Sequence, residues 1–89
     1  MPVVLIPTAY RAPTQGKAEI ETAGADVGSC LREVDARHPG FLELVLDEDG
    51  AVHRFVKLFV NEEEIPREAL DTAVAADDRI EVLAAIAGG

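Results

Sequence analysis

The stretch Asp26-Val27-Gly28-Ser29-Cys30-Leu31-Arg32-Glu33-Val34 decides the fold of this chain, because apolar residues recur in it with the spacing of a helix. Asp26 is a good N-cap, and Pro39-Gly40 ends the helix after His38. The residues at positions i, i+3, i+4 and i+7 form one apolar face: Val27, Cys30, Leu31 and Val34. An amphipathic helix of this kind buries its apolar face against a second layer of structure.

Patterns typical of strands lie on both sides of this helix. Residues 2–7 are a short apolar run between two prolines, which predicts a strand buried on much of both faces. Residues 17–22 alternate, with Ala18 and Ile20 on one side, and predict an edge strand antiparallel to the first. Residues 54–61 and 79–84 alternate after the helix. The chain therefore has two predicted strands before the helix and two after it.

The segments between these elements are predicted to be connections. Residues 8–16 contain a proline and a glycine without periodicity and predict a loop. Residues 41–46 are apolar but too few for a main helix, so we expect one irregular turn that covers the sheet. The remaining connections are turns at residues 47–50 and 61–64 and a short helical turn at residues 66–70.

The order strand, strand, helix, strand, strand is the β-grasp arrangement, an α+β fold in which one main helix covers one face of a mixed sheet. In this arrangement the first and last strands lie side by side and parallel in the middle of the sheet. We therefore expect one β-grasp domain over residues 1–84. Residues 85–89 are predicted to be a flexible C-terminal Gly-Gly tail.

Length and composition limit the possible functions. A chain of 89 residues forms one domain and is too small to enclose an active site of the usual kind, so we expect no enzyme activity of its own. A net charge of −9 argues against binding nucleic acid. The acidic surface favours a basic partner, or it keeps a small protein soluble. One cysteine, no apolar run of about 20 residues and no basic leader predict a cytoplasmic protein.

The sequence offers no pattern that predicts a metal site. Cys30 lies on the apolar face of the predicted helix, which indicates a small buried hydrophobic residue and not a nucleophile. His38 and His53 do not have the spacing of zinc ligands with Cys30. Residues 47–50 resemble part of a calcium loop, but valines occupy two positions where that loop needs acidic residues. We expect no bound metal.

The last residues, Ala87-Gly88-Gly89, have chemistry of their own. Two glycines without Cβ atoms can enter a narrow cleft as a thin thread. A terminal carboxylate on Gly89 is ionised at neutral pH and can attack the α-phosphate of ATP. The mixed anhydride that forms could accept sulfur or be passed to an amine. A frayed chain end is the alternative interpretation.

Short motifs connect this pattern with a known family: Ile6-Pro7-Thr8, His53-Arg54-Phe55-Val56, Phe59-Val60-Asn61-Glu62 and the final Ala87-Gly88-Gly89. With them the chain resembles, over nearly its whole length, the ubiquitin-like sulfur carrier proteins of the MoaD/ThiS family. It is most similar to the CysO type of actinobacteria. It differs from that type at Ala84, where such tails tend to have a proline.

This resemblance implies a carrier and not a catalyst. A ubiquitin-activating-type enzyme would use ATP to adenylate Gly89, so the carrier itself would bind no cofactor. A sulfur donor would then convert the adenylate to a thiocarboxylate. A client synthase would incorporate that sulfur into cysteine, a cofactor or a secondary metabolite. Two alternatives are a ubiquitin-like modifier conjugated through Gly89, and a non-covalent β-grasp adaptor in which the glycines are incidental.

The strand alternation also predicts a surface for a partner protein. If Val56 and the residues that alternate with it face the helix, Phe59 points to the opposite face of the sheet. Leu83 on the last strand and Leu5 on the first join it there. Clustered apolar residues on a sheet face are typical of an interface, although single exposed ones are common. We expect Leu5, Phe59 and Leu83 to dock the activating enzyme.

Overall fold

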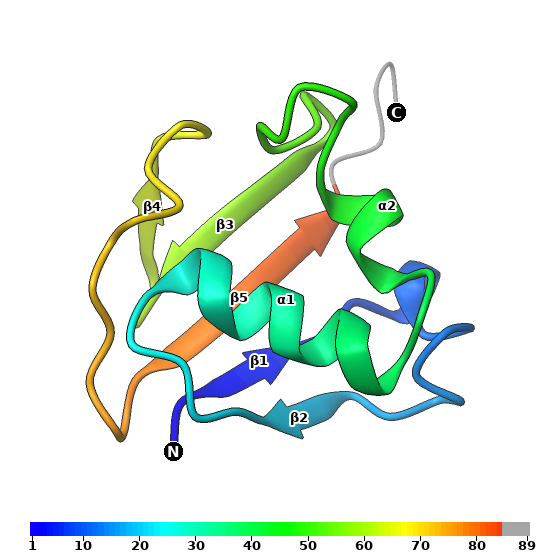
Figure 1. The fold of residues 1–89 in the computed structure, drawn as a ribbon, viewed down its shortest axis with the longest axis horizontal. Helices are drawn as coiled ribbons and strands as arrows, with labels where there is room; N and C mark the ends of the chain where they lie inside the picture. The colour runs from blue at the N-terminus through cyan, green and yellow to red at the C-terminus, as the bar shows by residue number, and fades with distance from the viewer. Residues whose placement is uncertain (85–89) are drawn as a thin grey trace.

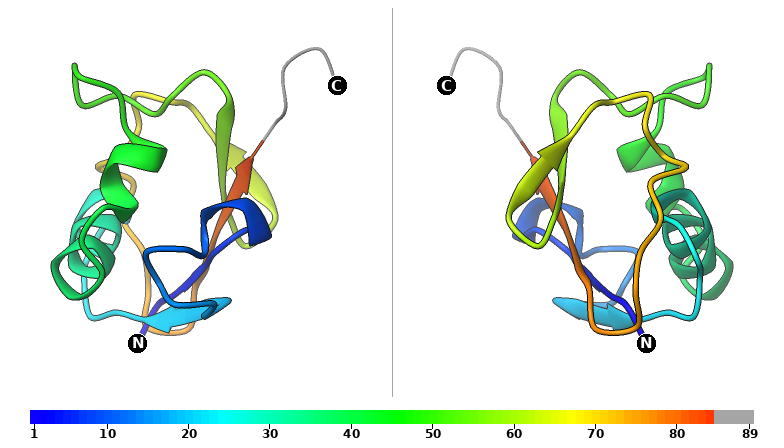
Figure 2. Two further views of the ribbon diagram at one scale, coloured as in Figure 1. Left: turned by 90° about the vertical axis from the view of Figure 1, so that its right-hand side faces the viewer. Right: turned by 90° about the vertical axis from the view of Figure 1, so that its left-hand side faces the viewer.

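The computed structural model describes residues 1–84, so the predicted tail at residues 85–89 lies outside the described residues. Five strands form one sheet, and the two α-helices pack on one of its faces (Figures 1 and 2). The elements in chain order are β1 (Val3–Leu5), the 3₁₀ helix η1 (Thr8–Tyr10), β2 (Glu19–Glu21), α1 (Val27–Arg37), α2 (Phe41–Val45), β3 (Val56–Val60), β4 (Glu63–Ile65) and β5 (Arg79–Ala84).

The sheet is mixed and has the strand order β2-β1-β5-β3-β4. β1 and β5 are parallel, whereas the β1–β2, β3–β5 and β3–β4 pairs are antiparallel. The first and last strands are therefore neighbours in the interior of the sheet, with β5 at its centre, as the sequence predicted. The β-grasp fold is confirmed.

The main helix forms as its sequence predicts. The Asp26 Oδ1 accepts a hydrogen bond from the Ser29 backbone N–H at 2.7 Å, which caps the first turn. The whole predicted apolar face of α1 is buried. Residues 41–46 were predicted to form one irregular turn, but Phe41–Val45 form the short helix α2, whose buried Phe41 and Val45 cover the sheet as expected. The helices and the sheet form two layers, with the core between them (Figure 2).

The core is built from alternate residues of the strands. Val4, Ile80 and Val82 are buried on the helix side of the central strands, while the residues between them point to the other face. The complete set of buried apolar residues is Val4, Ile6, Ile20, Val27, Cys30, Leu31, Val34, Phe41, Val45, Val52, Val56, Leu58, Ile80 and Val82. We call the sheet face opposite α1 the open face.

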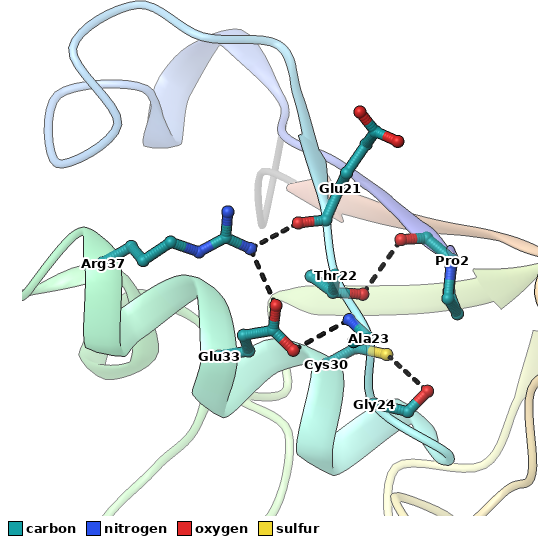
Figure 3. A network of polar contacts seen from close by, with 8 residues as sticks. All are labelled: Pro2, Glu21, Thr22, Ala23, Gly24, Cys30, Glu33 and Arg37. Atoms are coloured by element: carbon teal, nitrogen blue, oxygen red, sulfur yellow. Dashed lines mark hydrogen bonds and ion pairs between the residues drawn. The ribbon is translucent and has the colours of Figure 1, made fainter.

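Polar contacts fasten the edge strand β2 to α1 (Figure 3). The Arg37 guanidinium donates to the Glu21 carbonyl oxygen and to Glu33. The Glu33 carboxylate in turn accepts from the Ala23 backbone N–H at 2.9 Å. These contacts satisfy backbone groups at the exposed edge of β2, which would otherwise be available to another strand.

The structure contains one more strand than predicted. β4 comprises Glu63–Ile65, although residues 61–64 were expected to be a solvated turn. The turn is formed by Asn61 and Glu62 alone, whose φ angles are 51° and 73°. Val60 pairs with Glu63 directly after it, so the chain returns as a two-residue hairpin. The acidic side chains of β4 are exposed because β4 lies at the edge of the sheet.

Three local predictions were wrong. Residues 66–70 form no helix; the Ala69 N–H donates to the Pro66 carbonyl oxygen at 3.0 Å in a turn. Ala18 was predicted in the edge strand on the same side as the buried Ile20, but it precedes β2 and is exposed. The loop at residues 8–16 contains η1, in which the Tyr10 N–H donates to the Pro7 carbonyl oxygen.

Candidate functional site

The candidate site has two parts, the predicted tail and the open face of the sheet. Ala87, Gly88 and Gly89 lie outside the described residues. The structure does describe the strand that leads to them: β5 ends at Ala84, which is paired with Val56 at the start of β3. The pairing of β5 with β1 extends only as far as Glu81, so at Ala84 the end of β5 is held by β3 alone.

The structure places the three predicted docking residues on the open face. Val56 and Leu58 are buried against the helices, so Phe59 points the other way and is half-buried. Leu5 is also half-buried, and Leu83 is 41% exposed. The alternation that predicted this arrangement therefore holds in all three strands.

The three residues do not form one continuous apolar surface. In the strand register, Leu5 of β1 pairs with Glu81 of β5, and Phe59 of β3 pairs with the same glutamate. Leu83 lies two residues further along β5, where it pairs with Lys57. A carboxylate therefore separates Leu5 from Phe59 at the middle of the open face.

Two shallow hollows border this carboxylate. Leu5, Glu81 and Leu83 line a hollow of about 370 Å³ on the β1–β2 side. A second hollow of about 440 Å³ is lined by Leu5, Arg79 and Glu81 together with Asn61 and Glu62 of the β3–β4 turn. The open face thus has room for partner side chains on both sides of Glu81.

An exposed aromatic residue next to the end of β5 was not among the predicted site residues. Phe55 is 44% exposed and directly precedes Val56, the partner of Ala84. The Arg54 guanidinium lies 5.2 Å from the centre of the Phe55 ring. In the sequence, Phe55 alternates with Lys57 and Phe59, and this pattern could have identified Phe55 as a residue of the open face. Glu81 was also missed, because its position between Leu5 and Phe59 depends on the strand register.

The remaining candidate groups do not form a reactive centre within residues 1–84. Cys30 is fully buried, and its Sγ donates to the Gly24 carbonyl oxygen at 3.7 Å (Figure 3). The His53 Nε2 lies 3.3 Å from the Glu43 carbonyl oxygen. Among the described residues, no three histidine, cysteine or acidic side chains are grouped so that they could hold a metal ion. No described helix has the length and apolar character needed to cross a membrane.

The fold and the open face define a ubiquitin-like β-grasp protein. Residues 4–89 match the ThiS family, and the chain belongs to this family. The match includes the described domain from Val4 onward and the final Gly88-Gly89.

Relatives within this family are similar over nearly their whole length. The chain is 35% identical over 89 residues to the sulfur carrier protein CysO of Mycobacterium tuberculosis, covering 97% of this chain and 96% of the relative. The crystal structure of CysO from that organism matches with a TM-score of 0.88 and 31% identity, over 97% of this chain and 100% of the other. A crystal structure of the Amycolatopsis orientalis BexX/CysO complex matches with a TM-score of 0.86 and 33% identity, over the full length of both chains.

Proposed function

We propose that this protein is a sulfur carrier that is loaded at Gly89. The Gly89 carboxylate attacks the α-phosphate of ATP on an activating enzyme, and pyrophosphate leaves. Sulfide supplied by the sulfur donor then attacks the acyl carbon of the adenylate, AMP leaves, the sulfide proton is lost to solvent, and a thiocarboxylate results. The observation that supports this proposal most directly is the ThiS-family match that extends through Gly88-Gly89, together with 35% identity to a sulfur carrier protein.

The described domain fits a carrier better than a catalyst. Cys30, the single thiol of the chain, is buried and bonded to a carbonyl oxygen, so it is not placed to handle sulfur. A thioacid is ionised at neutral pH, so the loaded Gly89 would itself be the nucleophile. No acid or base on the domain is needed, because the chemistry takes place on the partner enzymes.

The open face is the surface that we propose for docking the activating enzyme. Within residues 1–84 no helix layer covers it, and it bears Leu83, which is 41% exposed, on the strand that ends at Ala84. An enzyme bound there would lie beside the start of the tail segment. Leu5 and Phe59 add half-buried apolar surface on the two neighbouring strands.

The first test is the intact mass of the protein purified from its native host. A sulfur that replaces one oxygen adds about 16 Da, and oxidation of Cys30 adds nearly the same mass, so fragmentation must locate the change. We expect the increase on Gly89, with no increase in a variant that lacks Gly88 and Gly89. The same spectrum shows whether Gly89 has a free carboxylate in the cell. An unmodified Gly89, even after incubation with ATP, the host's activating enzyme and a sulfur donor, contradicts the proposal.

Two other results would indicate a different function. Larger conjugates joined through Gly89 to lysines of other proteins would identify a modifier, which shares the adenylation step. Unchanged function after deletion of Gly88 and Gly89 would identify a non-covalent adaptor. We place the proposed carrier in the cytoplasm, where ATP and the partner enzymes are available, and cell fractionation tests this location.

The docking surface has its own test. We expect Phe59→Ser and Leu83→Ser each to lower kcat/KM for adenylation by about tenfold or more, because each removes apolar contact area from the interface. Leu44→Ser is the matched control, since Leu44 is a partly exposed leucine on α2, in the helix layer. Equal kinetics for all three variants, with the fold intact by circular dichroism, would refute docking on the open face.

A further inference from the structure

Five residues, one from each strand, form a row across the open face. In register order from β2 to β4 they are Glu19, Leu5, Glu81, Phe59 and Glu64. Acidic and apolar residues alternate along this row, with Glu81 at its centre. The row lies across the surface that the proposed function assigns to the activating enzyme.

The two outer carboxylates have partners within the protein. The Arg79 guanidinium lies 3.6 Å from a Glu19 carboxylate oxygen, and the Lys57 ammonium lies 3.5 Å from a Glu64 oxygen. These two cations flank Glu81 on the open face, but each is directed to an acid at the edge of the sheet.

The central carboxylate, that of Glu81, differs from the two outer ones in the part of the chain that the structure describes. Within residues 1–84, Glu81 takes part in no ion pair and accepts no side-chain hydrogen bond. Arg11 also borders the neighbouring hollow, but its Nε donates to the Ile6 carbonyl oxygen at 3.0 Å. In the free protein Glu81 is exposed, so water solvates its charge.

Docking on the open face changes the surroundings of Glu81. An enzyme that covers Leu5 and Phe59 must also cover the residue between them, because all three lie in one row. Removing a carboxylate from water without a compensating charge strongly opposes association. The hollows on both sides of Glu81 leave space for a long side chain to reach it.

We propose that the activating enzyme binds Glu81 through an arginine, so that Glu81 selects the partner. This inference rests on the proposed function. An arginine is favoured over a lysine because its planar guanidinium binds a carboxylate through two parallel hydrogen bonds. The guanidinium can also stack on the neighbouring Phe59 ring. A cation from the partner also suits a chain whose net charge is −9.

The test compares two variants that remove the same charge. Glu81→Gln keeps the size of the side chain, and Glu48→Gln removes one carboxylate from the exposed turn that follows α2. Glu48 takes part in no ion pair within residues 1–84. The probe is the host's adenylating enzyme, and the dissociation constant is measured by calorimetry. We expect Glu81→Gln to weaken binding by about tenfold or more, and Glu48→Gln by less than about twofold.

Charge reversal makes the test specific for a cation. Glu81→Arg is expected to weaken binding further than Glu81→Gln, and exchange of the contacting arginine of the enzyme for glutamate is expected to restore it. Equal or tighter binding of Glu81→Gln would overturn the inference, because Glu81 would then be an unmatched charge. Equal losses in both glutamine variants would also overturn it, because net charge alone would explain them. If wild-type protein is not adenylated at all, the proposed function itself fails.

Discussion

At the scale of single residues, Asp78 joins the β3–β4 turn to the start of β5. The Ala75 backbone N–H donates to the Asp78 Oδ2 at 2.7 Å, and the Asn61 side chain donates to Oδ1 at 2.8 Å. The Asn61 side-chain oxygen in turn accepts from the Arg79 N–H at 2.9 Å. The hydrogen bond from Ala75, followed by that from Asn61, lowers the pKa of Asp78 below its usual 3.8.

This lowered pKa predicts how the contribution of Asp78 depends on pH. Its carboxylate stabilises the fold above the unfolded pKa, and the stabilisation is lost as the pH falls through the folded pKa. The difference in unfolding free energy between wild type and Asp78→Asn should therefore be equal near pH 7 and pH 5, and smaller near pH 3. Urea unfolding at the three pH values measures it.

The neighbouring acid provides the control for this measurement. Asp77 makes no side-chain hydrogen bond within residues 1–84, so Asp77→Asn should leave the unfolding free energy near pH 7 unchanged. A destabilisation by Asp78→Asn that is the same at all three pH values would show that the carboxylate charge has no role in this contact.

At the scale of secondary-structure elements, the segment that precedes α1 is closely packed around Gly24. A Cβ atom added to Gly24 would lie 2.8 Å from the Cys30 backbone nitrogen and 2.9 Å from the Ser29 Cβ. Neither neighbour is the free end of a flexible side chain, so α1 or the segment before it must move. The Cys30 thiol, which donates to the Gly24 carbonyl oxygen, lies 3.0 Å from the same point.

We therefore predict that Gly24→Ala destabilises the domain by about 1–3 kcal/mol. Chemical denaturation compared with wild type measures the effect. Ala25→Ser is the control, because Ala25 is exposed and adjacent in sequence. In a Cys30→Ala background, Gly24→Ala should cost less than in wild type but should still destabilise, since the closest contact is with backbone. Wild-type stability in Gly24→Ala would mean that the start of α1 can shift without cost.

The sequence was sufficient for the elements that have a strong period. The apolar face of α1 and its Asp26 cap were predicted correctly because both depend on residues close together in the chain. β4 was missed for two reasons. The usual Asn-Gly signal of a tight hairpin is replaced by Asn61-Glu62. The exposed glutamates of this edge strand also give no alternation of apolar and polar residues.

Residues 66–70 form a turn and not the predicted helix, and the segment that follows makes contacts with α1. The first N–H groups of α1 need acceptors, and those of Val27 and Gly28 donate to the carbonyl oxygens of Thr72 and Leu70 at 3.0 and 2.8 Å. These carbonyl groups bond to α1, a contact that no local pattern in residues 66–70 encodes.

The open face was predictable only in part for a similar reason. Alternation placed Leu5, Phe59 and Leu83 on one face, since each strand has a period of two. Which residues lie beside one another depends on the register between β1, β5 and β3, which joins distant parts of the chain. Glu81 could therefore not be placed between Leu5 and Phe59 from the sequence.

At the scale of the whole molecule, acidic charge is concentrated in a small volume. The molecule spans 35 × 28 × 23 Å and has a net charge of −9. Electrostatic interactions between exposed charges extend over about 30 Å in 10 mM salt, but only over about 8 Å in 150 mM salt. In dilute buffer each carboxylate is therefore repelled by acids across the whole protein, which destabilises the compact state.

This repulsion predicts that salt stabilises the fold. The four ion pairs within residues 1–84 lie at the surface, with side chains that are 27–60% exposed and N–O distances from 3.0 to 3.6 Å, and surface pairs lose little when screened. In a domain of this size, relief of about 1 kcal/mol of repulsion raises Tm by about 4–8 °C. We therefore expect Tm to rise by about 4–8 °C between about 10 and 150 mM NaCl. A triple variant tests the role of net charge: Glu48→Lys/Asp49→Lys/Glu68→Lys. Each exchange changes the net charge by two, so the total goes from −9 to −3, and the rise of Tm with salt should be much smaller. Calorimetric scans of both proteins test this, and a Tm that falls with salt would show that the ion pairs outweigh the net repulsion.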